Sequence, residues 1–267
     1  MKKPRQKVIP VLGGATQITV NIAGKGKPLL YLHAAAGYYW DDFLDTLADY
    51  YTVYVPHFPG TAPGRPNDID KIDNLWDAVI AYEDLLDGLG LKKFRLIGHS
   101  FGGMLAAELA AQRPKAVENL VLIAPIGLWR EDAPYTVADW CTLNSEEILD
   151  VLFYDQTNPR VVRRMSPPSG KDAEALWLVD FIWTLGCTGK VIWPIPDKGL
   201  KKRIHRISAP SLIVWGENDR LIPPVYAEEF GRCIPHAQHL LLPQCGHEPP
   251  LEQCEALLSR VRGFFEA

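Results

Sequence analysis

The chain has 267 residues, 47% of them hydrophobic and 22% charged, which is the composition of an ordinary globular protein. A chain of this length buries a large core without metals or disulfides, as one domain or one domain with an insertion. Its formal net charge of −4 argues against a nucleic-acid partner. We expect the one basic cluster to be a solvated helical face; it consists of Lys198, Lys201, Lys202, Arg203 and Arg206.

The cysteines and the N-terminus bear on the compartment. The five cysteines form no Cys-x-x-Cys pair and leave an odd one over; they are Cys141, Cys187, Cys233, Cys245 and Cys254. This pattern favours scattered thiols in a reducing compartment. The basic start is followed by an apolar stretch at 8–12 that is too short for a signal peptide, and no uninterrupted apolar run approaches a membrane span of roughly 18 residues. We therefore expect a cytoplasmic protein without a membrane partner.

Short apolar segments alternate with helical patterns along the chain. The segments with strand character are 7–12, 16–22, 28–33, 52–56, 94–97, 120–124, 211–215 and 239–242. Helical spacing of apolar residues covers about 40–50, 72–89 with Gly90 as its C-terminal cap, about 101–112, and about 250–265. This alternation predicts an α/β fold with a mostly parallel central sheet that is flanked by helices.

The alternation is interrupted over residues 126–202. This stretch lacks obvious buried strands and holds five of the eight tryptophans, namely Trp129, Trp140, Trp177, Trp183 and Trp193. We predict a mainly helical cap inserted between sheet strands, with a core formed by 1–125 and 203–267. An ordinary helical excursion without a role at the site is the alternative.

A Gly98-x-Ser100-x-Gly102 motif lies between a predicted strand and a predicted helix. In that context the serine sits on a sharp turn with its oxygen clear of the sheet, and the crowded flanking positions require glycine. The following helix directs its free N–H groups at the reacting oxygen. Ser100 is therefore the candidate nucleophile, and the N–H of Phe101 is the candidate first donor of an oxyanion hole.

A serine hydroxyl needs a base, and His247 follows the last predicted strand on a loop at the carboxyl edge of the sheet. Asp219 follows the preceding strand and so lies at the same edge, where it would orient the imidazole. Glu217 and Asp132 are alternative acids. The order Ser, Asp, His along the chain is the one expected of this fold. No histidine–carboxylate group has metal-site spacing, so we predict neither metal nor cofactor.

With these residues in place, nearly the whole chain resembles the α/β-hydrolase superfamily. The matching motifs are His-Ala-Ala-Ala-Gly at 33–37, Gly-His-Ser-Phe-Gly-Gly at 98–103, Trp-Gly-Glu-Asn-Asp at 215–219 and Gly-His at 246–247. The start of the predicted cap, Ala-Pro-Ile-Gly-Leu-Trp at 124–129, is similar to the capped branch of esterases and C–C bond (meta-cleavage-product) hydrolases. The serine nucleophile argues against epoxide hydrolases and haloalkane dehalogenases, which use an aspartate.

The chain departs from this family's pattern at two places. Relatives usually have His-Gly where this chain has His33 and Ala34, and their second oxyanion donor corresponds to the N–H of Ala35. Alanine disfavours positive φ, so this loop is expected to differ. Relatives also often carry an acidic residue at the position of His57, which is either structural here or directed into the pocket.

The resemblance implies acyl transfer to water, in which Ser100 attacks a carbonyl and His247 takes its proton. A small, largely apolar ester is the expected substrate, and a homo-oligomer is compatible with the sequence. The candidate pocket residues are His33, Tyr38, Tyr39, Trp40, His57, His99, Trp129, Trp140 and Trp183.

Three alternatives share these residues. The first is C–C hydrolysis of a vinylogous 1,5-diketone, an acidic substrate for which Arg130, Lys190 or Arg220 would supply a cation. The second is a cofactor-free peroxidase or perhydrolase side activity. The third is a catalytically silent ligand-binding homologue, against which the complete Ser100, Asp219 and His247 set argues.

Overall fold

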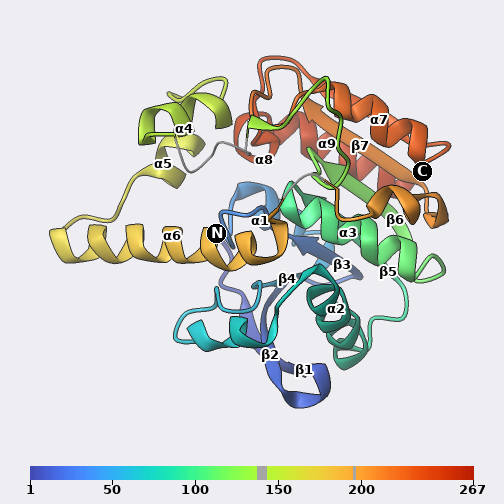
Figure 1. Cartoon of the computed structure of the whole chain (residues 1–267), viewed down its shortest axis with the longest axis horizontal. Helices are drawn as coiled ribbons and strands as arrows, with labels where there is room; N and C mark the ends of the chain where they lie inside the picture. The colour runs from blue at the N-terminus through green and yellow to red at the C-terminus, as the bar shows by residue number, and fades with distance from the viewer. Residues whose placement is uncertain (137–142, 195–196) are drawn as a thin grey trace.

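The computed structural model describes residues 1–136, 143–194 and 197–267. Its centre is an eight-stranded sheet with strand order β1-β2-β4-β3-β5-β6-β7-β8 (Figure 1). Strand β2 pairs antiparallel with both of its neighbours, β1 and β4. The remaining pairings in this order, from β4–β3 through β7–β8, are parallel. The strands are β1 (Arg5–Val11), β2 (Thr16–Ala23), β3 (Lys27–Leu32), β4 (Tyr51–Pro56), β5 (Phe94–His99), β6 (Val117–Ile123), β7 (Ser211–Gly216) and β8 (Gln238–Leu242). Each overlaps a predicted strand, so the predicted mostly parallel sheet is confirmed.

Helices cover both faces of the sheet because its parallel strands alternate their side chains between two apolar layers. Leu30 and Leu32 pack with α2, α3 and α7, whereas Leu29 and Tyr31 pack with α1 and α9. These helices are α1 (Asp42–Leu47), α2 (Leu75–Leu89), α3 (Phe101–Gln112), α7 (Val225–Cys233), α8 (Pro249–Glu252) and α9 (Cys254–Glu266). Short 3-10 turns are η1 (Leu12–Gly14), η2 (Pro66–Lys71), η4 (Leu200–Lys202) and η5 (Ile204–Arg206).

The helices agree with prediction at the capped ends and differ elsewhere. Gly90 ends α2 in the left-handed conformation, as predicted. The last predicted helix is two helices, because Gln253 leaves helical geometry between α8 and α9. Helix α7 was not predicted, although Tyr226 and Phe230 lie four residues apart and are both buried.

The chain leaves the sheet after β6 and returns at β7, and we call the intervening residues 124–210 the insert. Its helices are α4 (Ser145–Leu152), α5 (Pro159–Met165) and α6 (Lys171–Ile192), which lie to one side of the sheet in Figure 1. The described part of the insert is thus mainly helical, as expected. The domain limits at 125/126 and 202/203 remain predictions.

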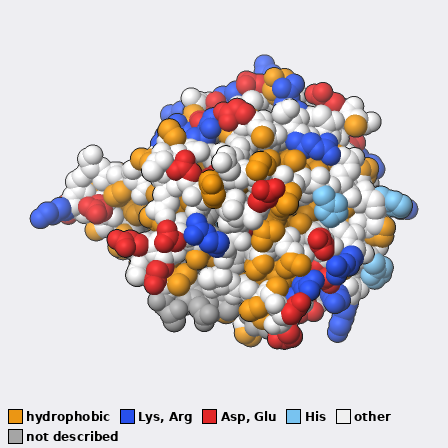
Figure 2. All heavy atoms as spheres, turned by 90° about the horizontal axis from the view of Figure 1, so that it is seen from above, with side chains coloured by type: hydrophobic (Ala, Val, Ile, Leu, Met, Phe, Trp, Pro, Cys, Tyr) orange, Lys and Arg blue, Asp and Glu red, His pale blue; other side chains and the backbone are white. Residues whose placement is uncertain are grey.

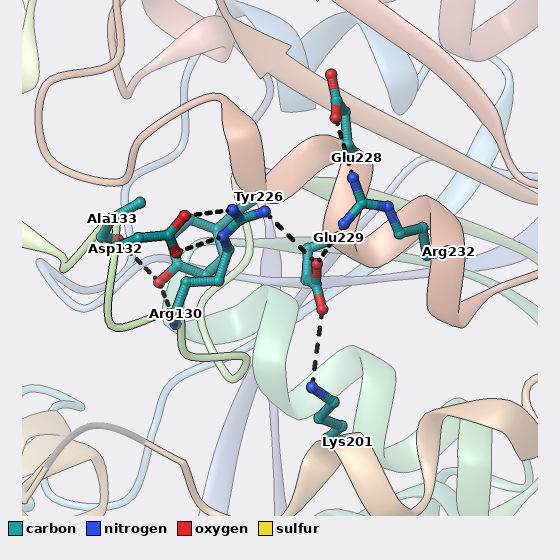
Figure 3. Close-up of polar contacts among 8 residues, drawn as sticks. All are labelled: Arg130, Asp132, Ala133, Lys201, Tyr226, Glu228, Glu229 and Arg232. Carbon is teal, nitrogen blue, oxygen red and sulfur yellow. Dashed lines mark hydrogen bonds and ion pairs between the residues drawn. The ribbon is translucent and has the colours of Figure 1, made fainter.

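Polar contacts attach the start of the insert to α7 (Figure 3). The hydroxyl of Tyr226 accepts a hydrogen bond from the N–H of Arg130 at 2.8 Å and donates one to the carbonyl of Ala133 at 2.9 Å. The guanidinium of Arg130 pairs with Asp132 and, at 3.8 Å, with Glu229. One tyrosine and one arginine therefore hold this segment against the body of the fold.

Arg203 departs from the predicted solvated basic face. Lys201, Lys202 and Arg206 are exposed, but Arg203 makes two hydrogen bonds, 2.8 and 2.6 Å, to the buried carboxylate of Glu108 in α3. A charge run in the sequence does not show which member faces a buried acid, so this prediction was wrong for Arg203.

Candidate active site

A cavity of about 800 Å³ lies where the sheet meets the insert. Ser100 follows β5, Asp219 follows β7 and His247 follows β8, so all three lie past the carboxyl ends of parallel strands. Ser100 and His247 line the cavity. This is the edge at which open α/β sheets bind ligands, and the volume suits a small molecule.

Ser100 stands on a strained turn. Its backbone has φ 53° and ψ −115°, a positive φ that side-chain-bearing residues seldom adopt. A Cβ on Gly98 would lie 2.4 Å from the carbonyl oxygen of Gly102, and a Cβ on Gly102 would lie 2.2 Å from that of Leu32. The turn therefore needs both glycines, which is the reason the motif predicted it.

A chain of hydrogen bonds connects the three predicted residues. The Nε2 atom of His247 lies 2.9 Å from the Oγ of Ser100, and its Nδ1 atom lies 2.8 Å from the Oδ2 of Asp219. The other oxygen of Asp219 accepts the backbone N–H groups of Leu221 and Ile222 at 2.9 and 2.8 Å. With Nδ1–H donating to the fixed carboxylate, Nε2 is free to accept the serine proton.

The two alternative acids do not reach the imidazole. Glu217 is exposed to solvent beyond the end of β7. Asp132 is exposed as well, and Arg130 holds its carboxylate through two hydrogen bonds (Figure 3). The loop after β7 turns back at Asp219, whose side chain is fully buried, so this carboxylate alone among the three meets His247.

Opposing influences act on the imidazole. Burial by itself lowers the pKa of His247, but the charge and hydrogen bond of Asp219, together with the charges of Glu248 and Glu252, outweigh it. The pKa of His247 is therefore raised above its ordinary value. An imidazole that must accept a proton works only above its pKa.

We expect kcat/KM to fall on the acid side with a midpoint above the ordinary histidine value of about 6.5. Glu248→Gln removes a negative charge that favours imidazolium, so the acid limb should move to lower pH. Glu217→Gln, at an exposed position, is the matched control and should leave the limb in place. A pH–rate profile for the three proteins checks this, and an acid limb that Glu248→Gln leaves unchanged would contradict it.

Three groups hold the His247 loop in position. The Nε2–H of His99 donates to the carbonyl of His247 at 2.9 Å, and burial lowers the pKa of His99. The N–H of His247 donates to the carbonyl of Leu152 at 2.7 Å, which connects the loop to the end of α4. Glu252 accepts the N–H groups of Gly246 and of Tyr154, at 2.8 and 2.7 Å. Glu252 was not predicted as a site residue, because no local pattern shows that its carboxylate bonds to the insert.

The two candidate oxyanion donors both line the cavity. Phe101 is the first residue of α3, where an N–H has no partner within the helix. Within the described residues, the N–H of neither Phe101 nor Ala35 donates to another backbone group. Ala34 and Ala35 avoid positive φ, which occurs instead at Gly37. The alanines are therefore accommodated because the loop makes its left-handed turn later.

The cavity includes three of the predicted pocket residues, His33, Tyr39 and His99. Five others do not line it, and for these the prediction was wrong: Tyr38, Trp40, His57, Trp129 and Trp183. Trp140 lies outside the described residues. The five are engaged elsewhere, since the ring N–H of Trp183 donates to Gly60 at 2.8 Å, that of Trp40 donates to Asp45 at 2.9 Å, and Trp129 packs edge-on against Tyr135.

His57 has a structural environment. Its Nε2 atom lies 2.7 Å from the side-chain nitrogen of Asn21, and Tyr38 packs on its ring with centroids 4.7 Å apart. Burial lowers the pKa of His57 to about 4. His33 lies nearby, and its Nε2 atom accepts the N–H of Phe58 at 3.1 Å, while burial lowers its pKa to about 4. Both imidazoles are therefore neutral at pH 7.

Three charged side chains that were not predicted as site residues also border the cavity: Asp41, Arg164 and Glu248. Burial raises the pKa of Asp41 to about 7. Arg164, from α5, lies over the ring of Tyr39 at 5.0 Å and donates to the carbonyl of Ala36 at 3.3 Å.

The three cations considered from the sequence lie elsewhere. Lys190 pairs with Asp73 at 3.1 Å, and Arg220 donates to the carbonyl of Phe153 at 3.1 Å. Arg130 lies at the contact with α7 (Figure 3). None of these three side chains lines the cavity. Among the described residues, the cation that lines it is the guanidinium of Arg164.

The fold and the site define the class. The model of the alpha/beta hydrolase family matches residues 29–260, and the chain belongs to this family. The resemblance and the α/β-hydrolase fold expected from the sequence are thus confirmed, and the protein is a hydrolase.

The names of its relatives give different substrates. The chain is 28% identical over 256 residues to a pimeloyl-[acyl-carrier protein] methyl ester esterase of Nitrosomonas europaea, an alignment that covers 91% of this chain and 97% of that protein. It is 25% identical to a 2-hydroxy-6-oxo-2,4-heptadienoate hydrolase of Pseudomonas putida, covering 96% and 95%. The solved structure of a membrane phospholipase A shares the fold with a TM-score of 0.78 at 18% identity, covering 99% of this chain and 86% of that one.

Proposed function

We propose that the protein is a serine hydrolase that cleaves a small, neutral, largely apolar carboxylic ester through an acyl-enzyme on Ser100. The observation that carries the proposal is the continuous hydrogen-bonded chain from Ser100 through His247 to Asp219, which ends at the cavity. A nucleophile, a base and an acid that orients the base are the parts that this chemistry needs.

The steps follow from the geometry. The Oγ of Ser100 attacks the ester carbonyl while Nε2 of His247 takes its proton, and the N–H groups of Phe101 and Ala35 stabilise the oxyanion. The imidazolium then protonates the departing alkoxide, which leaves as an alcohol. Water, deprotonated by the same imidazole, attacks the acyl-serine, and its proton returns to Ser100 as the carboxylic acid leaves.

The charges around the cavity favour a neutral substrate. Asp41 and Glu248 contribute two carboxyl groups, and Arg164 contributes one guanidinium. Because the pKa of Asp41 is about 7, its carboxyl group loses a proton as the pH rises through this value. The cavity then gains negative charge. A carboxylate substrate would meet repulsion from these groups, whereas an uncharged ester would not.

C–C bond hydrolysis of a meta-cleavage-type diketone is the second candidate. The relative from Pseudomonas putida is named as the hydrolase of a 2-hydroxy-6-oxo-dienoate, and Arg164 gives this cavity a cation that such an acidic substrate would need. The same three residues would serve both reactions, so the substrate must distinguish them.

Hydrolysis of p-nitrophenyl esters from acetate to decanoate should be measured beside a 2-hydroxy-6-oxo-dienoate. We expect kcat/KM for the best ester to exceed that for the dienoate by roughly a hundredfold or more, since like charges brought together cost several kcal/mol. The acyl length with the highest kcat/KM would show how long an acyl chain the cavity accommodates. Faster turnover of the dienoate would overturn the ester assignment in favour of the C–C hydrolase.

A further inference from the structure

The N-terminal half of α6 projects from the protein. In this helix, which the structure describes in full, the buried residues begin at Thr184, so residues 171–183 extend over about 20 Å without a buried side chain. Figure 1 shows this half reaching beyond the other helices, and Figure 2, seen from above, shows the same projection.

The projecting half is apolar although it is exposed. Leu176, Val179 and Ile182 are 65%, 59% and 60% exposed, and Leu178 and Trp183 are exposed as well. Within the described residues, α6 is the one helix long and apolar enough to cross a membrane by length and composition, yet only 22% of that window is buried inside the protein. Asp180 interrupts the apolar stretch of α6, so the stretch is not one uninterrupted apolar run in the sequence. An exposed apolar surface of this kind indicates a binding site for an apolar partner.

The placement of the apolar side chains favours lipid over a second copy of the chain. Leu176, Val179 and Trp183 share one side of the helix by their spacing of three and four residues. Leu178 and Ile182, four residues apart, lie on the side that lines the cavity. By the same spacing Ile182 lies beside Val179, so the exposed apolar side chains form one continuous face that includes the rim of the cavity. A second copy packed on that face would cover the rim of a hydrolase's cavity, whereas a lipid surface would present apolar esters to it.

The charges on α6 indicate the charge of the lipid surface that it would bind. The helix carries two lysines and three acidic residues, so it offers no basic face to an anionic membrane; these residues are Lys171, Lys190, Asp172, Glu174 and Asp180. Tryptophans such as Trp177 and Trp183 are residues that favour the boundary between water and hydrocarbon. The attraction is therefore hydrophobic, and the matching surface is uncharged.

We propose that the projecting half of α6 docks on an uncharged lipid surface of zwitterionic phospholipid, lying along the interface and not across it. Because Leu178 and Ile182 both line the cavity and are exposed, the rim of the cavity runs along the docked helix. Docking would bring that rim to the lipid phase, where apolar esters concentrate. This departs from the expectation of no membrane partner.

Co-sedimentation with phosphatidylcholine vesicles tests the proposal without any turnover, so it stands or fails separately from the ester activity. We expect the wild-type protein to pellet with vesicles equally at low and high salt. The double variant Leu176→Ser/Val179→Ser alters side chains outside the cavity lining, and it should bind roughly tenfold or more weakly. Its kcat/KM on a short, soluble ester should equal that of the wild type.

The matched control is Val8→Ser/Leu241→Ser, which removes two similarly exposed apolar side chains on the edge strands β1 and β8. It should bind vesicles as the wild type does. The proposal is overturned if the wild type stays in the supernatant, or if the α6 variant binds as well as the control. A wild-type dimer that the α6 variant splits, without vesicle binding, would assign this surface to a second copy instead.

Discussion

Ser100→Ala is expected to lower kcat for p-nitrophenyl ester hydrolysis by at least about ten-thousandfold. The alanine removes the oxygen that forms the acyl-enzyme, and His247 then has no hydroxyl to deprotonate. What remains is the contribution of binding and of the oxyanion donors, which is small beside that of the intact set in serine hydrolases. Initial rates with a saturating ester measure the change.

The fold should survive this substitution. Alanine meets the same positive φ as serine at this turn, so the backbone strain is unchanged and the melting temperature should stay close to that of the wild type. Ser208→Ala, at an exposed serine, is the matched control and should keep full activity. If Ser100→Ala hydrolysed esters at the wild-type rate, the assignment of the whole site would fail.

Arg203→Met is expected to produce the largest loss of stability, about 3 kcal/mol or more in the free energy of unfolding. The side chain of Glu108 is 0% exposed in α3, and Arg203, 19% exposed, is its bidentate partner. Removing the guanidinium leaves a buried carboxylate without its counter-charge. For a chain of this size the melting temperature should fall by roughly 6 °C or more, which thermal unfolding by circular dichroism will show.

Two comparisons separate this effect from simple loss of an arginine. Arg232→Met breaks ion pairs with Glu228 and Glu229 at a side chain that is 63% exposed (Figure 3), and should cost less than about 1 kcal/mol. Adding Glu108→Leu to Arg203→Met removes the stranded charge and should recover much of the lost stability. A single Arg203→Met variant as stable as Arg232→Met would refute the buried-pair explanation.

The glycine motif and the mostly parallel sheet were predicted from the sequence, because a strand-turn-helix motif and an alternation of strands and helices are local patterns. A Cβ on Gly98 would meet the backbone of Gly102 within the motif, whereas a Cβ on Gly102 would meet the backbone of Leu32, which lies on β3 and far away in the sequence. Asp219 and His247 follow apolar runs with strand character, and parallel strands bring their carboxyl ends to one edge.

The pocket was predicted less well for the opposite reason. Trp183 and His57 have the residue types expected of a pocket, yet Trp183 hydrogen-bonds to Gly60 and His57 to Asn21, on segments far away in the sequence. Arg164 and Asp41 were not predicted, because a cation on one helix and an acid before another form a pattern only when the two helices meet in the fold. The lining depends on how segments cross, which residue type alone does not encode.

By itself, then, the sequence determined the sheet, the turn at Ser100 and the identity of its two partners, since apolar periodicity and turn chemistry act over a few residues. Only the tertiary structure decided which charges border the cavity, that Arg203 neutralises a buried Glu108, and that half of an apolar helix stands in solvent. A residue is buried by segments that are distant in the sequence. The sequence around the residue is the same whether or not those segments pack on it, so it does not show burial.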